Sequence, residues 1–150
     1  MRFAALISCL VPAGVSAQKP RDLSKLDPCT ILTSADVAAA TKGKVSSSAG
    51  GGVGAAACMW VVDAPSGAGT YQLFLEQPSV VEALWNMKNA AEKGTAVSGL
   101  WNEAYMTPPG PNRDQFILTA LKRGDMAIEV HGMNKDAVVS LGRTAVSRLK

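Results

Sequence analysis

The strongest signals for the fold are the stretch Asp27-Pro28-Cys29-Thr30-Ile31-Leu32-Thr33-Ser34-Ala35-Asp36-Val37 and, further along the chain, Cys58-Met59-Trp60. Cys29 and Cys58 are the two cysteines that remain once a leader is removed, and an even set in an exported protein favours one structural disulfide. The sequence lacks a Cys-x-x-Cys pair, which argues against a reactive thiol. The pair therefore predicts a covalent link between a helix and a strand in an oxidising compartment.

Residues 1–17 have the order of a secretory signal peptide. Arg2 precedes a short apolar stretch and a run of small residues, so cleavage is expected after Ala17. The apolar stretch is shorter than the roughly 20 residues that a membrane-spanning helix needs. Leu6-Ile7-Ser8-Cys9 has the form of a lipobox, which leaves a lipid anchor at Cys9 as an alternative. The sequence predicts export to the periplasm or the extracellular space, without a transmembrane segment.

Length and charge exclude some classes of protein. About 133 residues follow the leader, enough for one domain with its own core. Removal of Arg2 lowers the count of Lys and Arg from 15 to 14 against 12 Asp and Glu, a net charge of +2. Because the two signs are interspersed, we expect no nucleic-acid partner, since such domains concentrate Lys and Arg on one face.

Helix and strand signals divide the first half of the chain. Thr33 and Asp36 form a capping box that starts a helix expected over 34–42. Residues 46–57 are almost entirely Ser, Gly and Ala, which is typical of a flexible loop. The β-rich runs 59–62 and 71–75 flank a segment with Pro and Gly suited to a hairpin.

The next signals predict a second helix. Ser79 and Glu82 repeat the capping-box spacing, and Val80, Leu84, Met87 and Ala91 follow as an apolar stripe at helical spacing up to a stop at Gly94. Residues 96–105 support either a short helix or the start of a strand. The prolines of 108–111 then form a stiff exposed loop.

The last third contains the clearest hairpin pattern. Residues 115–122 and 126–131 flank Arg123-Gly124-Asp125, and the alternation assigns Met126, Ile128 and Val130 to the core. The tripeptide spells an adhesion motif, but Gly and Asp are ordinary residues of a tight turn. Asn134 fits the cap of a final helix.

These elements follow the order α-β-β-α-(β)-β-β-α. Hairpins interrupted by helices favour the α+β class, an antiparallel sheet of about four to five strands packed with three helices and one disulfide. We expect residues 18–28 to be a lead-in segment and residues 29–150 to form a single domain.

Candidate residues for chemistry are few. His131 is the only histidine, and on a strand it would share a face with Glu129. Two such residues could begin a metal site or an acid–base pair, but a half-exposed structural histidine is the stronger interpretation. We therefore predict no enzyme activity, no cofactor and no metal.

The best candidates for a partner-binding surface are aromatic and proline side chains. Trp101 and Tyr105 adjoin the stiff loop, where amphipathic rings often meet a partner. Packing at the core or its rim is the alternative role for both rings. The candidate surface consists of Trp101, Tyr105, Pro108, Pro109 and Pro111.

The sequence resembles a family of small secreted or lipid-anchored bacterial proteins of unknown function, best populated in actinobacteria. The matching elements are the phrase from Asp27 to Val37, Cys58-Met59-Trp60, Gly99-Leu100 and Gly124-Asp125. The family is similar to the extracellular sensor-like domains of mycobacterial serine/threonine kinases. The resemblance implies a disulfide between Cys29 and Cys58 and an antiparallel sheet packed with helices, and it implies no catalytic residues.

Three functional hypotheses follow. The first is an exported, non-catalytic domain that binds an unidentified ligand or protein partner in the cell envelope. The second is an inhibitor or protective factor that acts on an envelope hydrolase. The third is an enzyme that uses His131 with Glu129.

Overall fold

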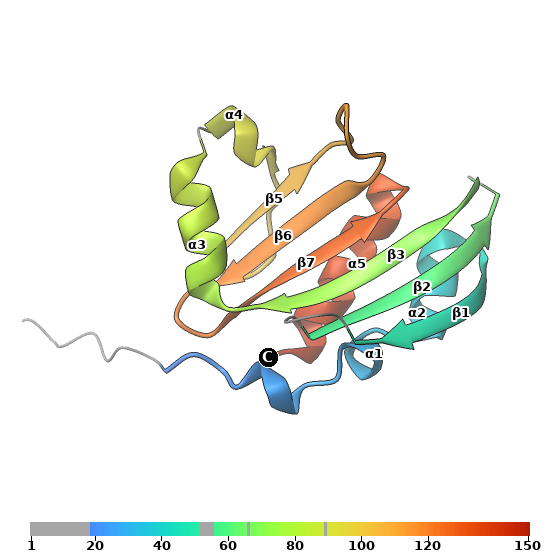
Figure 1. Ribbon diagram of the computed structural model, residues 1–150, viewed down its shortest axis with the longest axis horizontal. Coiled ribbons are helices and arrows are strands. Elements are labelled where there is room, and N and C mark those ends of the chain that lie inside the picture. The colour runs from blue at the N-terminus through green and yellow to red at the C-terminus, as the bar shows by residue number, and fades with distance from the viewer. Residues whose placement is uncertain (1–18, 52–55, 66, 89) are drawn as a thin grey trace, which may run out of the picture.

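The computed structural model describes residues 19–51, 56–65, 67–88 and 90–150. In these ranges seven strands form one sheet. They are β1 (Lys44–Gly50), β2 (Ala56–Ala64), β3 (Gly67–Glu76), β4 (Thr95–Ala96), β5 (Glu103–Thr107), β6 (Phe116–Lys122) and β7 (Met126–Gly132). Their order in the sheet is β1-β2-β3-β7-β6-β5-β4, and every neighbouring pair is antiparallel (Figure 1).

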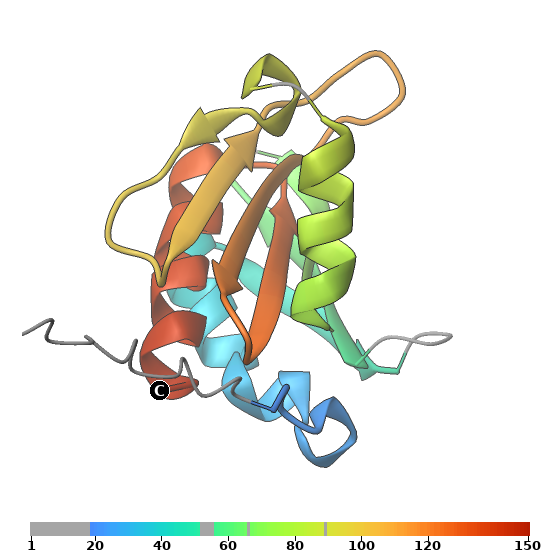
Figure 2. The same ribbon diagram turned by 90° about the vertical axis from the view of Figure 1, so that its left-hand side faces the viewer.

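Helices lie on both faces of this sheet. They are α1 (Pro28–Ile31), α2 (Ser34–Thr41), α3 (Pro78–Met87), α4 (Ala90–Lys93) and α5 (Lys135–Arg148), preceded by a 3-10 turn at Leu23–Lys25. Figure 2 shows α5 on one side of the sheet and α3 on the other. We call the face covered by α2 and α5 the core face, and the opposite one the α3 face.

The core face is built by strict alternation along the central strands. Met126, Ile128 and Val130 of β7 point to this face and are buried, as the sequence predicts. The other strands add side chains of the same kind, and α5 covers them with its own apolar stripe. The buried strand residues include Cys58, Trp60, Val62, Tyr71, Leu73, Leu75, Ala104, Met106, Leu118 and Ala120.

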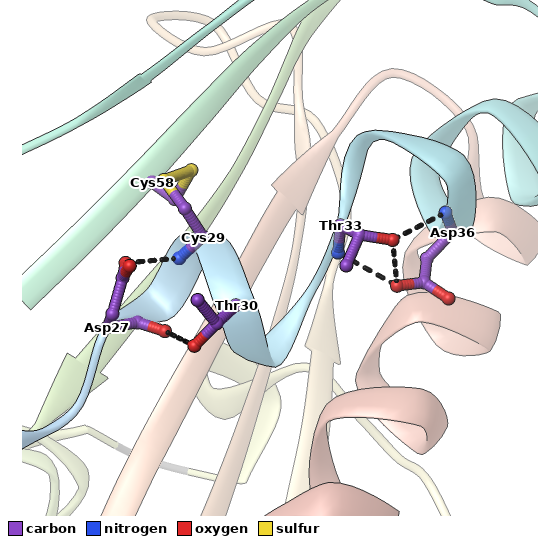
Figure 3. Close-up of a disulfide and its surroundings, with 6 residues drawn as sticks. All are labelled: Asp27, Cys29, Thr30, Thr33, Asp36 and Cys58. Carbon is purple, nitrogen blue, oxygen red and sulfur yellow. Dashed lines mark hydrogen bonds between the residues drawn. A yellow bond between two sulfur atoms is a disulfide. The ribbon is translucent and has the colours of Figure 1, made fainter.

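The Asp27–Val37 stretch forms two short helices joined at Leu32. Asp27 caps α1 by accepting a hydrogen bond from the Cys29 N–H at 2.9 Å. The capping box of Thr33 and Asp36 is confirmed at the start of α2 (Figure 3). Cys29 and Cys58 form a disulfide that joins α1 to β2, which is the pairing that the sequence favours.

The predicted four to five strands and three helices are wrong. The Ser, Gly and Ala run predicts a loop because it has little to bury, yet residues 46–50 belong to β1 and 56–57 to β2. An edge strand needs backbone partners rather than large side chains, and β2 supplies those partners. Residues 52–55 of that run lie outside the described residues, as do the predicted signal peptide and Cys9.

The stretch 96–105 is neither a single helix nor a single strand. It includes the end of β4, a turn and the first part of β5, and the two strands pair as a hairpin. The turn requires left-handed backbone at Gly99, with φ of 78°, and at Trp101, with φ of 38°. A bulky residue rarely adopts such a φ, so the packing around Trp101 holds the turn in place.

The helix predictions also need correction at their ends. α3 begins at Pro78, whose fixed φ and missing N–H suit the first turn, so Ser79 is not its cap. It ends at Met87, and α4 is a separate turn before Gly94. Pro28, the last residue of the predicted lead-in segment 18–28, likewise begins a helix. The predicted Asn134 cap of α5 is confirmed, since its side chain accepts from the Ala137 N–H.

Candidate functional site

The residues of the predicted partner surface do not lie together. Trp101 is half-buried against the hydrophobic cluster of the core face. Tyr105 points to the α3 face, where its ring meets Trp85 edge-on with the centroids 5.0 Å apart. The prolines of 108–111 are exposed at the other end of β5. The five residues are thus distributed over two faces and a loop.

The adhesion tripeptide is used within the fold. Asp125 is only 6% exposed, and its carboxylate accepts from the Arg21 guanidinium at 2.8 and 3.0 Å. The Lys122 ammonium lies 2.8 Å from the same carboxylate. Burial acts to raise the pKa of Asp125, but its bonds with Lys122 and Arg21 outweigh it and hold the pKa below its usual value. This carboxylate ties the N-terminal segment to the β6–β7 turn.

Polar side chains lie at the centre of the α3 face. β7 is the middle strand of the sheet, and it carries Glu129 and His131 on this face. The register forms two rows of side chains that cross neighbouring strands. The Glu129 row contains Ala57, Phe74, Glu129, Thr119 and Tyr105, and the His131 row contains Met59, Gln72, His131, Ile117 and Thr107.

Glu129 and His131 form a hydrogen-bonded pair. His131 Nε2 lies 3.1 Å from Glu129 Oε2, and the Thr119 hydroxyl donates to Glu129 Oε1 at 3.3 Å. The side chains are partly accessible, with 26% of Glu129 and 16% of His131 exposed. The Phe74 ring lies beside His131, with the ring centroids 4.9 Å apart. The pair is therefore oriented by its neighbours and still reachable from solvent.

The carboxylate of Glu129 is held in its ionised form. Burial acts to raise its pKa, but the bonds from His131 and Thr119 and the charge of Lys88 outweigh this effect, so the pKa lies below its usual value. Because an ionised carboxylate only accepts hydrogen bonds, Nε2 is the His131 nitrogen that carries the proton. Burial, and then the charge of Glu129, raise the pKa of Glu76 at the end of β3.

Large apolar side chains are also exposed on this side of the sheet. Met59, Val61, Val80, Leu84 and Met87 are between 37% and 75% exposed. Met59 and Val61 alternate with buried Trp60 and Val62 on β2, so they point to the α3 face. The other three come from α3, which crosses the same face (Figures 1 and 2).

The apolar stripe of α3 faces the open part of the sheet. Val81 and Trp85 are the α3 side chains that pack on the sheet, against Leu121 and Ala127. Glu82 and Asn86 line a groove with Glu103 and Arg123 near the strand ends. Helical spacing puts Val80, Leu84 and Met87 on the opposite side of α3, toward the middle of the strands.

We call this surface the open face. It consists of the polar centre, the ring beside it and the apolar rim: Glu76, Phe74, Glu129, His131, Met59, Val61, Val80, Leu84 and Met87. Only part of it follows from the sequence. The sequence predicts that Glu129 and His131 share a strand face. Its signal for Phe74 is the β-rich run 71–75, in which Phe74 alternates with the buried Leu73 and Leu75, and Glu76 continues that alternation just beyond the run.

The chemistry available to the open face is acceptance of hydrogen bonds, contact with apolar groups and proton exchange at His131. A carboxylate that orients an imidazole also occurs in general-base catalysis. Within the described ranges, however, the His131 ring bonds only to Glu129 and to no hydroxyl or thiol. In the same ranges, no set of three or more His, Cys, Asp or Glu side chains is arranged to hold a metal ion.

The described part of the chain contains no helix with the length and apolar character needed to cross a bilayer. No protein-family model matches the chain, and no curated protein matches it. Among solved structures, the chain is similar to a GTP binding regulator from Thermotoga maritima. The identity is 13%, the TM-score is 0.45, and the match covers 87% of this chain and 93% of that chain. At this TM-score the similarity supports no conclusion about fold or activity.

Proposed function

We propose that the protein is an exported, non-catalytic domain of the cell envelope that binds a partner through its open face. The leader-like residues 1–17 and the disulfide support export, because disulfides persist in oxidising compartments. The binding role rests on one observation. All five large apolar side chains that are exposed in the described residues belong to the open face.

Such clustering is unusual for a surface with no binding role. Single exposed apolar residues are common on proteins, whereas several large ones on one side of a sheet are typical of an interaction site. Here two elements far apart in the sequence, β2 and α3, supply the rim. On both β2 and α3, other apolar side chains are buried and already fill the core. The exposed apolar side chains are therefore not needed for the core.

Site-specific crosslinking in the producing cells tests this proposal. A photo-reactive amino acid at Met59 or at Leu84 should give the same adduct, recovered from the envelope fraction. The matched control is Ser140, which is exposed on α5 at the other side of the sheet and should give none of it. The adduct from Met59 should also be lost in a Leu84→Ser, Met87→Ser variant.

Two results would contradict the proposal. One is an adduct that forms equally from Ser140, and the other is the absence of any adduct from both positions of the open face. Exchange of His131 for alanine gives a separate test of the non-catalytic part, because a hydrolytic activity lost with that side chain would identify an enzyme.

A further inference from the structure

The polar centre of the open face has unused capacity to accept hydrogen bonds. An ionised carboxylate accepts about four, and Glu129 accepts two in the described residues, from His131 and Thr119. Glu76 lies one row away on the adjacent strand, since it pairs with Ala127 of β7. Within the described chain, no hydrogen bond reaches the Glu76 carboxylate.

The charge of this surface is opposite to that of the whole chain. Glu76 and Glu129 are both acidic, and the positive group whose charge acts on Glu129 besides His131 is Lys88, which is exposed after the end of α3. Two carboxylates against one imidazole leave the open face net negative, whereas the chain carries +3. A half-buried carboxylate amid apolar side chains binds a cation more strongly than the same group in water, because the local dielectric is lower.

The apolar surroundings determine what must accompany the cation. Phe74 stands next to Glu129 in the same cross-strand row, so a cation at Glu129 also lies beside an aromatic ring. Met59 and Val61 are exposed on β2, and Leu84 and Met87 are exposed on α3. A bare inorganic cation would leave all four exposed, whereas a cation carried among apolar groups would cover them.

We propose that the open face binds a segment of a protein partner in which a lysine or arginine stands among apolar side chains. This inference rests on the proposed function and names the chemistry of the partner. The size of the open face favours a polypeptide over a small amine as its ligand. The polar and apolar groups reach from β2 to β7, two strand spacings or about 10 Å, before the rim on α3 is included. The cation would bind Glu129 beside Phe74, and its apolar neighbours would cover Met59 and Leu84.

Titration of the purified protein with a helical peptide of leucine and lysine tests this inference. We expect the amide signals of β3, β7 and α3 to shift in NMR spectra, while those of α5 stay in place. Glu129→Gln should lower the affinity measured by calorimetry about tenfold, because a charge-assisted contact is lost. Glu82→Gln changes a glutamate on the far side of α3 and should leave the affinity unaltered. A peptide with glutamate in place of lysine should not bind.

A second variant keeps the test decisive if Glu129→Gln alters the fold. Leu84→Ser changes an exposed rim residue and should weaken binding while leaving circular dichroism unchanged. Equal weakening by Glu82→Gln, equal binding of both peptides, or binding of butylamine as tight as that of the peptide would each overturn the inference. Failure of the peptide combined with successful crosslinking at Met59 would refute the cationic partner and retain the proposed function.

Discussion

The two faces of the sheet use the same strands for different purposes. On the core face, neighbouring strands contribute apolar side chains that are almost completely buried under α2 and α5. On the α3 face, the apolar cluster of Val81 and Trp85 with Leu121 and Ala127 is sealed in this way. The rest carries a carboxylate–imidazole pair at the middle strand and an exposed apolar rim.

This difference separates stability from binding. Partial burial of an ionised carboxylate opposes folding unless it is hydrogen-bonded, so a purely structural face would place an apolar residue at the centre. The core face does so at Ile128 and Val130, which flank Glu129 along β7. We infer that the core face holds the domain together and that the open face is shaped by contact with a partner.

Two adjacent residues of β2 give the strongest test of the difference between the two faces. Trp60→Ala, on the core face, removes a side chain that is 1% exposed and should lower the free energy of unfolding by about 3–5 kcal/mol. Met59→Ala, next to it on the open face, should change it by less than about 0.5 kcal/mol. Urea denaturation followed by fluorescence measures both. Similar losses from the two variants would mean that the open face is part of the core.

A close approach on the core face gives a test of intermediate size. A Cβ on Gly132 would lie 2.3 Å from the Tyr71 ring and 2.9 Å from Val138. Gly132→Ala should therefore destabilise the protein by about 1–3 kcal/mol through overpacking. Gly110, whose added Cβ would meet nothing within 4 Å, is the matched control. Thermal unfolding that leaves both variants like the parent would show that this face is not closely packed.

The smallest expected effects concern the two glutamates of the open face, and they have opposite signs. The pKa of Glu129 is lowered, so its contribution to stability is present above the unfolded pKa and is lost as pH falls through the folded value. The pKa of Glu76 is raised, so its ionised form opposes folding at neutral pH. Glu129→Gln should thus lower the Tm and Glu76→Gln should raise it. Each exchange should change the free energy of unfolding by at most about 1 kcal/mol.

The effects of the two glutamate exchanges should disappear in acid, where both carboxyl groups are protonated in the parent. Melting curves recorded at neutral and acid pH measure this. Glu82→Gln serves as the control on α3, with little change expected at either pH. The same sign for both exchanges at neutral pH would contradict the assignment of the two environments.

Features of the fold that depend on residues close together in the sequence could be predicted, whereas features that depend on distant residues could not. The Thr33–Asp36 capping box and the Asn134 cap depend on neighbours a few residues apart, and both were predicted. The strand β1 was missed because its Ser, Gly and Ala side chains give no local signal, and its pairing with β2 supplies the structure. Val80, Leu84 and Met87 were identified as an apolar stripe, but spacing within a helix does not reveal that Val81 and Trp85 would be the side chains facing the sheet.

Local sequence was enough to predict the caps of α2 and α5, the alternation along β7 and the cysteines available for a disulfide, because local backbone hydrogen bonds and side-chain periodicity produce these features. Long-range pairing and packing set the seven-strand order, the open face and the distribution of Trp101, Tyr105 and the prolines over separate surfaces. The cause is the strand register. It aligns residues that lie tens of positions apart, such as Phe74, Glu129 and Thr119, and local sequence carries no record of that alignment.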